Sequence, residues 1–174
     1  MKFWLSLIAL SICFSTSLSA QEFNPKKIYQ KTSTAVVLVA AFERGDKGAS
    51  TGTGSILNKD GLILTNAHVI FNDERSKPFN SIRVFLKPDR VTGNLKNDTS
   101  QKYKATLVRY SNKLDLAVLK IQDPQIPKAL PLLELSDLNN TSIGDPVLAI
   151  GHPEQGGLWT LTTGTISSLI ENFE

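Results

Sequence analysis

Cysteine is almost absent from this sequence, and histidine is scarce. The 174 residues include one cysteine, Cys13, and two histidines, His68 and His152. Cys13 lies in an N-terminal segment that we expect to be removed, so the mature protein would have no disulfide and would depend on its hydrophobic core. Two histidines without a cysteine or a close carboxylate cluster make a poor metal-ligand set. The composition therefore predicts no metal site, and nothing in the sequence calls for a cofactor.

Strong charge of one sign and long apolar runs are also missing. The formal net charge is +3 at pH 7, and no basic cluster is interleaved with aromatic residues, which make up only 7% of the chain. This argues against nucleic acid as a partner. The apolar stretch from Phe3 to Phe14 is shorter than the ~20 residues that a membrane-spanning helix needs. We therefore expect no stable membrane anchor.

The first 20 residues have the order of a secretory signal peptide. A cation at Lys2 precedes the apolar stretch, and a small, hydroxyl-rich end follows it. We expect cleavage near Ala20 and export to the periplasm or the extracellular space. A lipid anchor on Cys13 is the alternative, but bulky Ile12 stands where a lipidation site takes a small residue.

Short strands dominate the expected secondary structure. A short helix is predicted from Asn24 to about Thr32, and Asp60-Gly61 marks a tight hairpin turn. The polar, turn-rich segment 87–102 is predicted to be a mobile surface loop. The predicted strands span residues 35–42, 52–57, 62–65, 81–86, 103–110, 116–121, 146–150 and 158–169. Their close spacing favours an all-β fold, an antiparallel barrel or sandwich.

His68 and Asp115 are the residues most suited to chemistry. His68 ends the apolar run GLILTNAHVI, and a buried imidazole needs partners for both ring nitrogens, which makes it a costly choice for filling a core. As a base it would need a carboxylate, and Asp115, at the start of the strand 116–121, is the best candidate. Taken singly, His68 could instead be a satisfied core residue and Asp115 the cap of a turn.

Several segments, in order, closely resemble signatures of the trypsin-like serine proteases, above all the disulfide-free HtrA/Deg type. They are Gly-x-Gly-Ser at 52–55, Thr-Asn-x-His-Val at 65–69, Asp-hydrophobic-Ala at 115–117, Gly-Asp at 144–145 and Gly-x-Pro at 151–153. The resemblance implies that His68 is a general base and that Asp115 orients it. It also implies polypeptide substrates and leaves room for a homo-oligomer of the full-length protein.

The same resemblance implies a trypsin-like double antiparallel β-barrel. We expect a signal peptide at 1–20, an N-terminal barrel with His68 and Asp115 at 21–130, and the start of a second, truncated barrel at 131–174. The motif that carries the family's nucleophile, Gly-Asn-Ser-Gly-Gly, is absent from the sequence. We therefore expect this chain to be an inactive part of an exported serine endopeptidase.

Two alternatives remain. The chain could be a non-catalytic secreted protein of the same fold that binds peptides or a partner. Ser50 also matches the Gly-x-Ser-x-Gly elbow of the α/β-hydrolases, with Asp115 and His152 following in that fold's order. However, that elbow requires a strand before the serine and a helix after it, and here a charged, glycine-rich loop precedes Ser50. In the trypsin-like interpretation, His152 is a polar turn residue before Pro153.

The signal-peptide interpretation predicts the N-terminus of the exported protein. Mass spectrometry should find a chain that begins at Ala20 or Gln21, because signal peptidase cuts after small residues of this kind. An intact Met1 on protein in the cytosolic fraction would contradict this interpretation.

Overall fold

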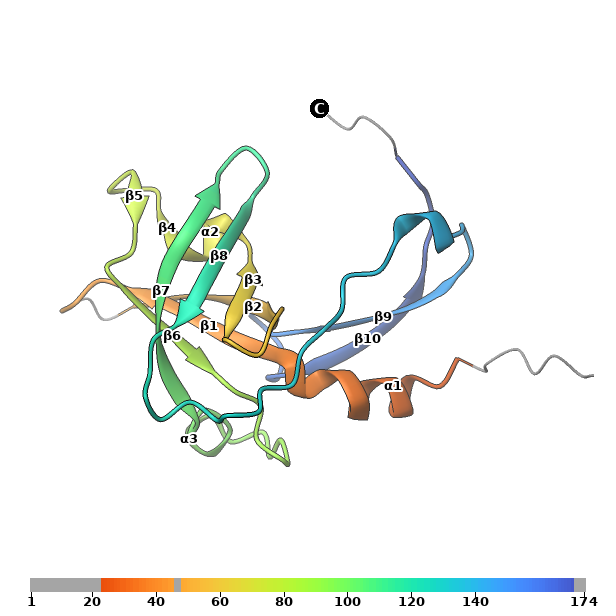
Figure 1. Ribbon diagram of the computed structural model, residues 1–174, viewed down its shortest axis with the longest axis horizontal. Coiled ribbons are helices and arrows are strands. Elements are labelled where there is room, and N and C mark those ends of the chain that lie inside the picture. Colours follow the sequence, from red (N-terminus) through yellow and green to blue (C-terminus); the bar gives the residue numbers. More distant parts are fainter. Residues whose placement is uncertain (1–22, 46–47, 171–174) are drawn as a thin grey trace, which may run out of the picture.

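The computed structural model describes residues 23–45 and 48–170 (Figure 1). The predicted signal peptide at residues 1–20, with Cys13, lies outside the described residues. Within the described ranges, no helix is both long enough and apolar enough to cross a membrane.

Six antiparallel strands form a closed barrel in the order β1-β2-β3-β8-β7-β6. The barrel closes because β1 pairs with β2 along one edge and with β6 along the other. Its strands are β1 (Val36–Phe42), β2 (Ser50–Ile56), β3 (Leu62–Thr65), β6 (Ser81–Phe85), β7 (Lys102–Ser111) and β8 (Leu116–Ile121). The prediction of an all-β fold with a complete first barrel is confirmed.

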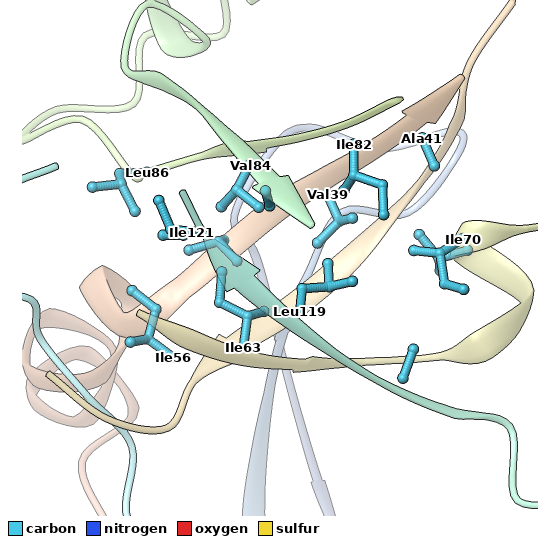
Figure 2. Packing of buried hydrophobic residues seen from close by; sticks show 14 of the residues in the cluster. Val39, Ala41, Ile56, Ile63, Ile70, Ile82, Val84, Leu86, Leu119 and Ile121 are labelled. Carbon is cyan, nitrogen blue, oxygen red and sulfur yellow. The ribbon is translucent and has the colours of Figure 1, made fainter. Parts of the chain in front are cut away.

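The barrel interior is filled by aliphatic side chains that alternate with outward-facing residues, as a closed sheet requires. β6 and β8 show this alternation, with every second residue buried. The first six residues of β1 are buried on both faces. Figure 2 shows how these side chains meet inside the barrel, among them Val39, Ile56, Ile63, Val84, Leu119 and Ile121.

Two glycines of β2 explain part of the Gly-x-Gly-Ser pattern. A β-carbon on Gly54 would lie 2.7 Å from Cγ2 of Ile63 and 3.1 Å from Cγ2 of Val39. A β-carbon on Gly52 would overlap Cγ2 of Val69, which follows His68. Both positions therefore need a residue without a side chain, since packed interiors have no room for an added methyl group.

The remaining elements are short. Asn24 accepts a hydrogen bond from the backbone N–H of Lys27 (3.0 Å) and caps the first helix, as predicted. In chain order these elements are α1 (Pro25–Thr32), the 3-10 helix η1 (Ser33–Ala35), α2 (Ala67–Ile70), β4 (Phe71–Asn72), β5 (Lys77–Pro78), α3 (Leu95–Asp98), the 3-10 helix η2 (Leu138–Asn140), β9 (Pro146–Gly151) and β10 (Thr160–Thr165).

β9 and β10 form a separate two-stranded sheet beside the barrel, next to α1 (Figure 1). Trp159, which is only 2% exposed, anchors this hairpin because its indole N–H donates to the carbonyl of Val36 (2.7 Å). The Tyr29 hydroxyl donates in turn to the carbonyl of Trp159 (2.8 Å). The second barrel is partial, with one hairpin among the described residues. The strand predicted at 158–169 spans only Thr160–Thr165, and it begins after Trp159 because that residue has a left-handed φ of 53°.

The segment 87–102, which was predicted to be a surface loop, contains the single helical turn of α3 and a buried carboxylate, so the prediction of a loop is wrong in part. Asp98 is 2% exposed and accepts hydrogen bonds from the backbone N–H groups of Thr92 (2.8 Å) and Gly93 (2.9 Å) and from the Thr92 hydroxyl (2.9 Å). Desolvation raises the pKa of Asp98, but these hydrogen bonds together outweigh it and lower the pKa below its ordinary value. The composition predicts a polar segment, but it does not show which of the carboxylates in that segment is buried.

The packing of β2 predicts that Gly54→Ala destabilises the protein. Overpacking a filled interior costs about 1–3 kcal/mol of unfolding free energy. The matched control is Gly164→Ala in β10, where an added β-carbon has no neighbour within 4 Å. This variant should stay within about 0.5 kcal/mol of the wild type. Urea unfolding measures both, and equal midpoints for the two variants would contradict the packing argument.

Candidate active site

The pairing of β3 with β8 brings His68 and Asp115 together across 47 positions of sequence. Thr65, the last residue of β3, pairs with Ala117 near the start of β8. The chain leaves β3 into the single turn of α2, which carries His68, while Asp115 directly precedes β8. Two residues at neighbouring strand ends therefore meet at one rim of the barrel.

Asp115 contacts His68 through both carboxylate oxygens. The imidazole Nδ1 lies 2.8 Å from Oδ2, and the backbone N–H of His68 donates to Oδ1 at 3.0 Å. The Asn66 side-chain amide donates to Oδ2 and to the backbone carbonyl of Asp115, both at 3.1 Å. Both the ring and the backbone of His68 are thus fixed by one carboxylate.

The Asp115 carboxylate also serves as the cap of α2. Asn66 occupies the N-cap position, where an asparagine usually accepts a backbone N–H of the first turn, but its side chain makes no such bond. Its amide donates to Asp115 instead, and Asp115 accepts the N–H of His68 in that first turn. A four-residue helix cannot stabilise itself, so this external cap fixes the turn.

The backbone of Asp115 is held in an uncommon conformation. Its φ is +48°, in the left-handed region that few residues other than glycine, asparagine and aspartate enter. The residue ends the Asn112–Asp115 turn, in which the N–H of Asp115 donates to the carbonyl of Asn112 (3.2 Å). This turn joins β7 to β8 and directs the carboxylate toward α2.

The hydrogen bonds to Asp115 favour its ionised form. The backbone N–H of His68 is the largest cause that lowers the pKa of Asp115, followed by the imidazole and then the Asn66 amide, whereas desolvation raises it. An ionised carboxylate can only accept hydrogen bonds, so Nδ1 of His68 carries the proton. In the neutral ring, Nε2 is then left with a free lone pair.

The candidate site is open to solvent, so the alternative that His68 is a satisfied core residue is wrong. The His68 side chain is 69% exposed and that of Asp115 is 45% exposed. A shallow hollow beside them is lined by Ala67, His68, Phe71, Asp73, Asn112 and Asp115. Phe71 packs against Tyr110 of β7, with ring centroids 5.8 Å apart, and so supports the end of α2. An exposed imidazole with Nε2 available can take a proton from a group placed in this hollow.

The other candidate residues lie elsewhere in the fold. Ser50 begins β2 and pairs with Ala41 of β1. The strand β2, and not a helix, continues directly from Ser50, so the nucleophile-elbow interpretation is wrong. Among the described residues, no group of three or more potential metal ligands occurs.

The packing of His152 and the contact of Asn66 with Asp115 were not predicted from the sequence. His152 follows β9, as a turn residue would, but it is half-buried and its ring packs against Trp159, with ring centroids 4.8 Å apart. Burial lowers the pKa of His152 to about 4. The contact of Asn66 with Asp115 was not predicted either, and its only sequence signal is an amide two residues before His68.

Comparison with known proteins identifies the family of this chain. The sequence model of the trypsin-like peptidase domain family matches residues 52–174. A probable periplasmic serine endoprotease, DegP-like, from Rickettsia prowazekii (strain Madrid E) is 37% identical over 122 residues, which are 70% of this chain and 20% of that protein. Serine protease HTRA1 from Xenopus tropicalis is 32% identical over 146 residues, 81% of this chain and 27% of the relative.

A solved structure shows the same fold. The crystal structure of the serine endoprotease from Yersinia pestis has a TM-score of 0.61 and 34% sequence identity, and the match covers 84% of this chain and 45% of that one. The chain spans about a fifth to a quarter of the length of the two curated relatives, from Rickettsia prowazekii and Xenopus tropicalis. The matched family, these relatives and the closed barrel together show that the chain belongs to the trypsin-like peptidase family and is of the HtrA/Deg type.

Proposed function

We propose that this chain is the N-terminal part of an exported serine endopeptidase, in which His68 is the general base and Asp115 orients it. The observation that carries the proposal is the double contact of Asp115 with His68, to the ring at 2.8 Å and to the backbone N–H at 3.0 Å. A protein that only bound peptides would have no need for an imidazole held in one tautomer. Membership of a family of serine endoproteases supports the same assignment.

The geometry supports a definite division of roles. Asp115 keeps the proton of the neutral ring on Nδ1, so Nε2 can accept the proton of a serine hydroxyl as that oxygen attacks a peptide carbonyl. The ring then carries a positive charge, which the adjacent Asp115 carboxylate stabilises. Nε2 later returns the proton to the leaving amine. The substrates are polypeptides, and none of these steps needs a cofactor.

The proposal places the nucleophilic serine in a segment beyond this sequence. Residues 1–174 contain no Gly-Asn-Ser-Gly-Gly motif, and the sequence matches only 20% and 27% of the two curated relatives. We place the serine and the backbone oxyanion donors downstream in the same gene product, and we expect residues 21–174 alone to be inactive. Reading the coding sequence past Glu174 decides the matter. A stop codon there would favour a non-catalytic binding protein.

Export and two barrel units complete the proposal. The signal-peptide pattern supports export, and one relative is named a periplasmic endoprotease. The first unit, residues 21–130, carries His68 and Asp115, while residues 131–174 begin the second barrel. The described part of this second unit is one hairpin, β9 with β10.

Asp115→Asn tests the proposal in the full-length protein. An asparagine amide can donate to Nδ1 and favours the wrong ring tautomer, so kcat should fall on the order of 10⁴-fold. Steady-state cleavage of a fluorogenic peptide measures this change, while circular dichroism checks the fold. The matched control is Asp89→Asn, at an exposed aspartate far in sequence from the pair, and it should keep wild-type kcat. A fully active Asp115→Asn enzyme would reject Asp115 as the orienting residue.

A further inference from the structure

The β9–β10 hairpin is fastened to the outer side of β2 by a reciprocal contact between Thr53 and His152. The backbone N–H of His152 donates to the Thr53 hydroxyl oxygen at 3.0 Å. The same hydroxyl lies 3.0 Å from Nδ1 of the His152 ring. Because the oxygen already accepts the backbone N–H, its own hydrogen is free to be donated to Nδ1. One hydroxyl therefore holds both the backbone and the ring of His152.

This contact lies in a sheltered place. The His152 ring meets Trp159 edge to face, and burial holds the pKa of His152 at about 4, so the ring is neutral near pH 7. Its Nε2 is buried and has no hydrogen-bond partner among the described residues. An unsatisfied buried ring nitrogen costs stability, so an imidazole here is a poor choice if its only purpose is packing.

A hydrogen bond and a packing contact link the β2 backbone around Thr53 to the turn that carries His68. The carbonyl of Thr53 accepts a hydrogen bond from the hydroxyl of Thr65 (2.8 Å), which is buried at the end of β3. Thr65 precedes the Asn66-Ala67-His68 segment that binds Asp115. The residue before Thr53 is Gly52, whose backbone lies directly against Val69, the residue after His68. The β2 backbone at Thr53 thus supports α2 from both sides of His68.

We infer that Thr53 and His152 form a positioning pair: they tie the β9–β10 hairpin to β2 and thereby hold the turn of His68 in register with Asp115. The inference rests on the proposed function, since it assigns these residues a task in that reaction. Neither residue touches the reacting atoms. Their effect passes through Thr65 and the packing of Val69 on Gly52, and it determines how closely the His68 ring meets Asp115.

The test uses Thr53→Val, which keeps the shape of the side chain and removes the hydroxyl, with Thr53→Ser as the matched control that keeps it. The primary readout needs no substrate: the ¹⁵N chemical shift of His68 Nδ1 in the full-length protein, assigned by comparison with His68→Gln. In Thr53→Val we expect this shift to move from the protonated, pyrrole-like value toward the average of the two tautomers. In Thr53→Ser it should stay at the wild-type value. We also expect kcat of Thr53→Val to fall by about tenfold at nearly unchanged KM, as small displacements of catalytic groups do.

A folded Thr53→Val protein with a wild-type His68 shift would overturn the inference. If Thr53→Val does not fold, His152→Asn and His152→Leu replace it. The asparagine oxygen can still accept from the Thr53 hydroxyl, so it should preserve the His68 shift, and leucine should change it. Equal shifts in these two variants would also overturn the inference. The shift is read without turnover, so the two proposals can fail separately. If the wild-type full-length protein shows no peptidase activity but Thr53→Val still displaces the His68 shift, the proposed peptidase is rejected and the positioning pair is kept.

Discussion

The carboxylate of Asp115 is the point on which the geometry of the candidate site depends. It accepts the N–H of His68 within the first turn of α2 and lies within hydrogen-bond distance of the ring of the same residue. A single turn of helix has almost no stability of its own, so this cap adds to the packing of buried Val69 in fixing the backbone of His68, and the same carboxylate orients its ring. The left-handed φ of Asp115, which directly precedes β8, directs its carboxylate toward α2.

The barrel makes this arrangement possible by placing two strand ends side by side. β3 and β8 pair over four residues, and their interior side chains, Ile63 and Leu119, are fully buried in the core of Figure 2. Sliding either strand by a single residue would turn that strand's own interior side chain out of the core, so the register is strongly specified. The hydrophobic core therefore fixes the distance between two exposed polar residues at its rim.

β2 links the barrel to the rest of the chain. Its glycines, 52 and 54, admit Val69 and Ile63 to close contact on the interior side, while Thr53 between them binds His152 on the outside. Alternation along one strand thus joins the support of His68 to the docking of the β9–β10 hairpin.

Local sequence patterns predicted much of the fold. β3 and β8 were predicted with their observed bounds, and the bounds of β1 and β6 are within one residue, because each has a clear apolar pattern and a nearby turn signal. The His68–Asp115 contact came from resemblance to a family, since no local pattern reports a contact over 47 positions. The burial of Asp98, the anchor at Trp159 and the Thr53–His152 contact were missed because each is set by tertiary packing.

The titration of Asp115 tests the central claim most directly. The side-chain carboxyl ¹³C resonance of this residue, followed by NMR as the pH is lowered, reports its pKa without any assumption about activity. If the N–H of His68, its ring and the Asn66 amide all bind the ionised carboxylate, the pKa of Asp115 lies below the ordinary value of an aspartate, about 3.9. A pKa at or above that value would contradict the claim that these hydrogen bonds hold the carboxylate in its ionised form.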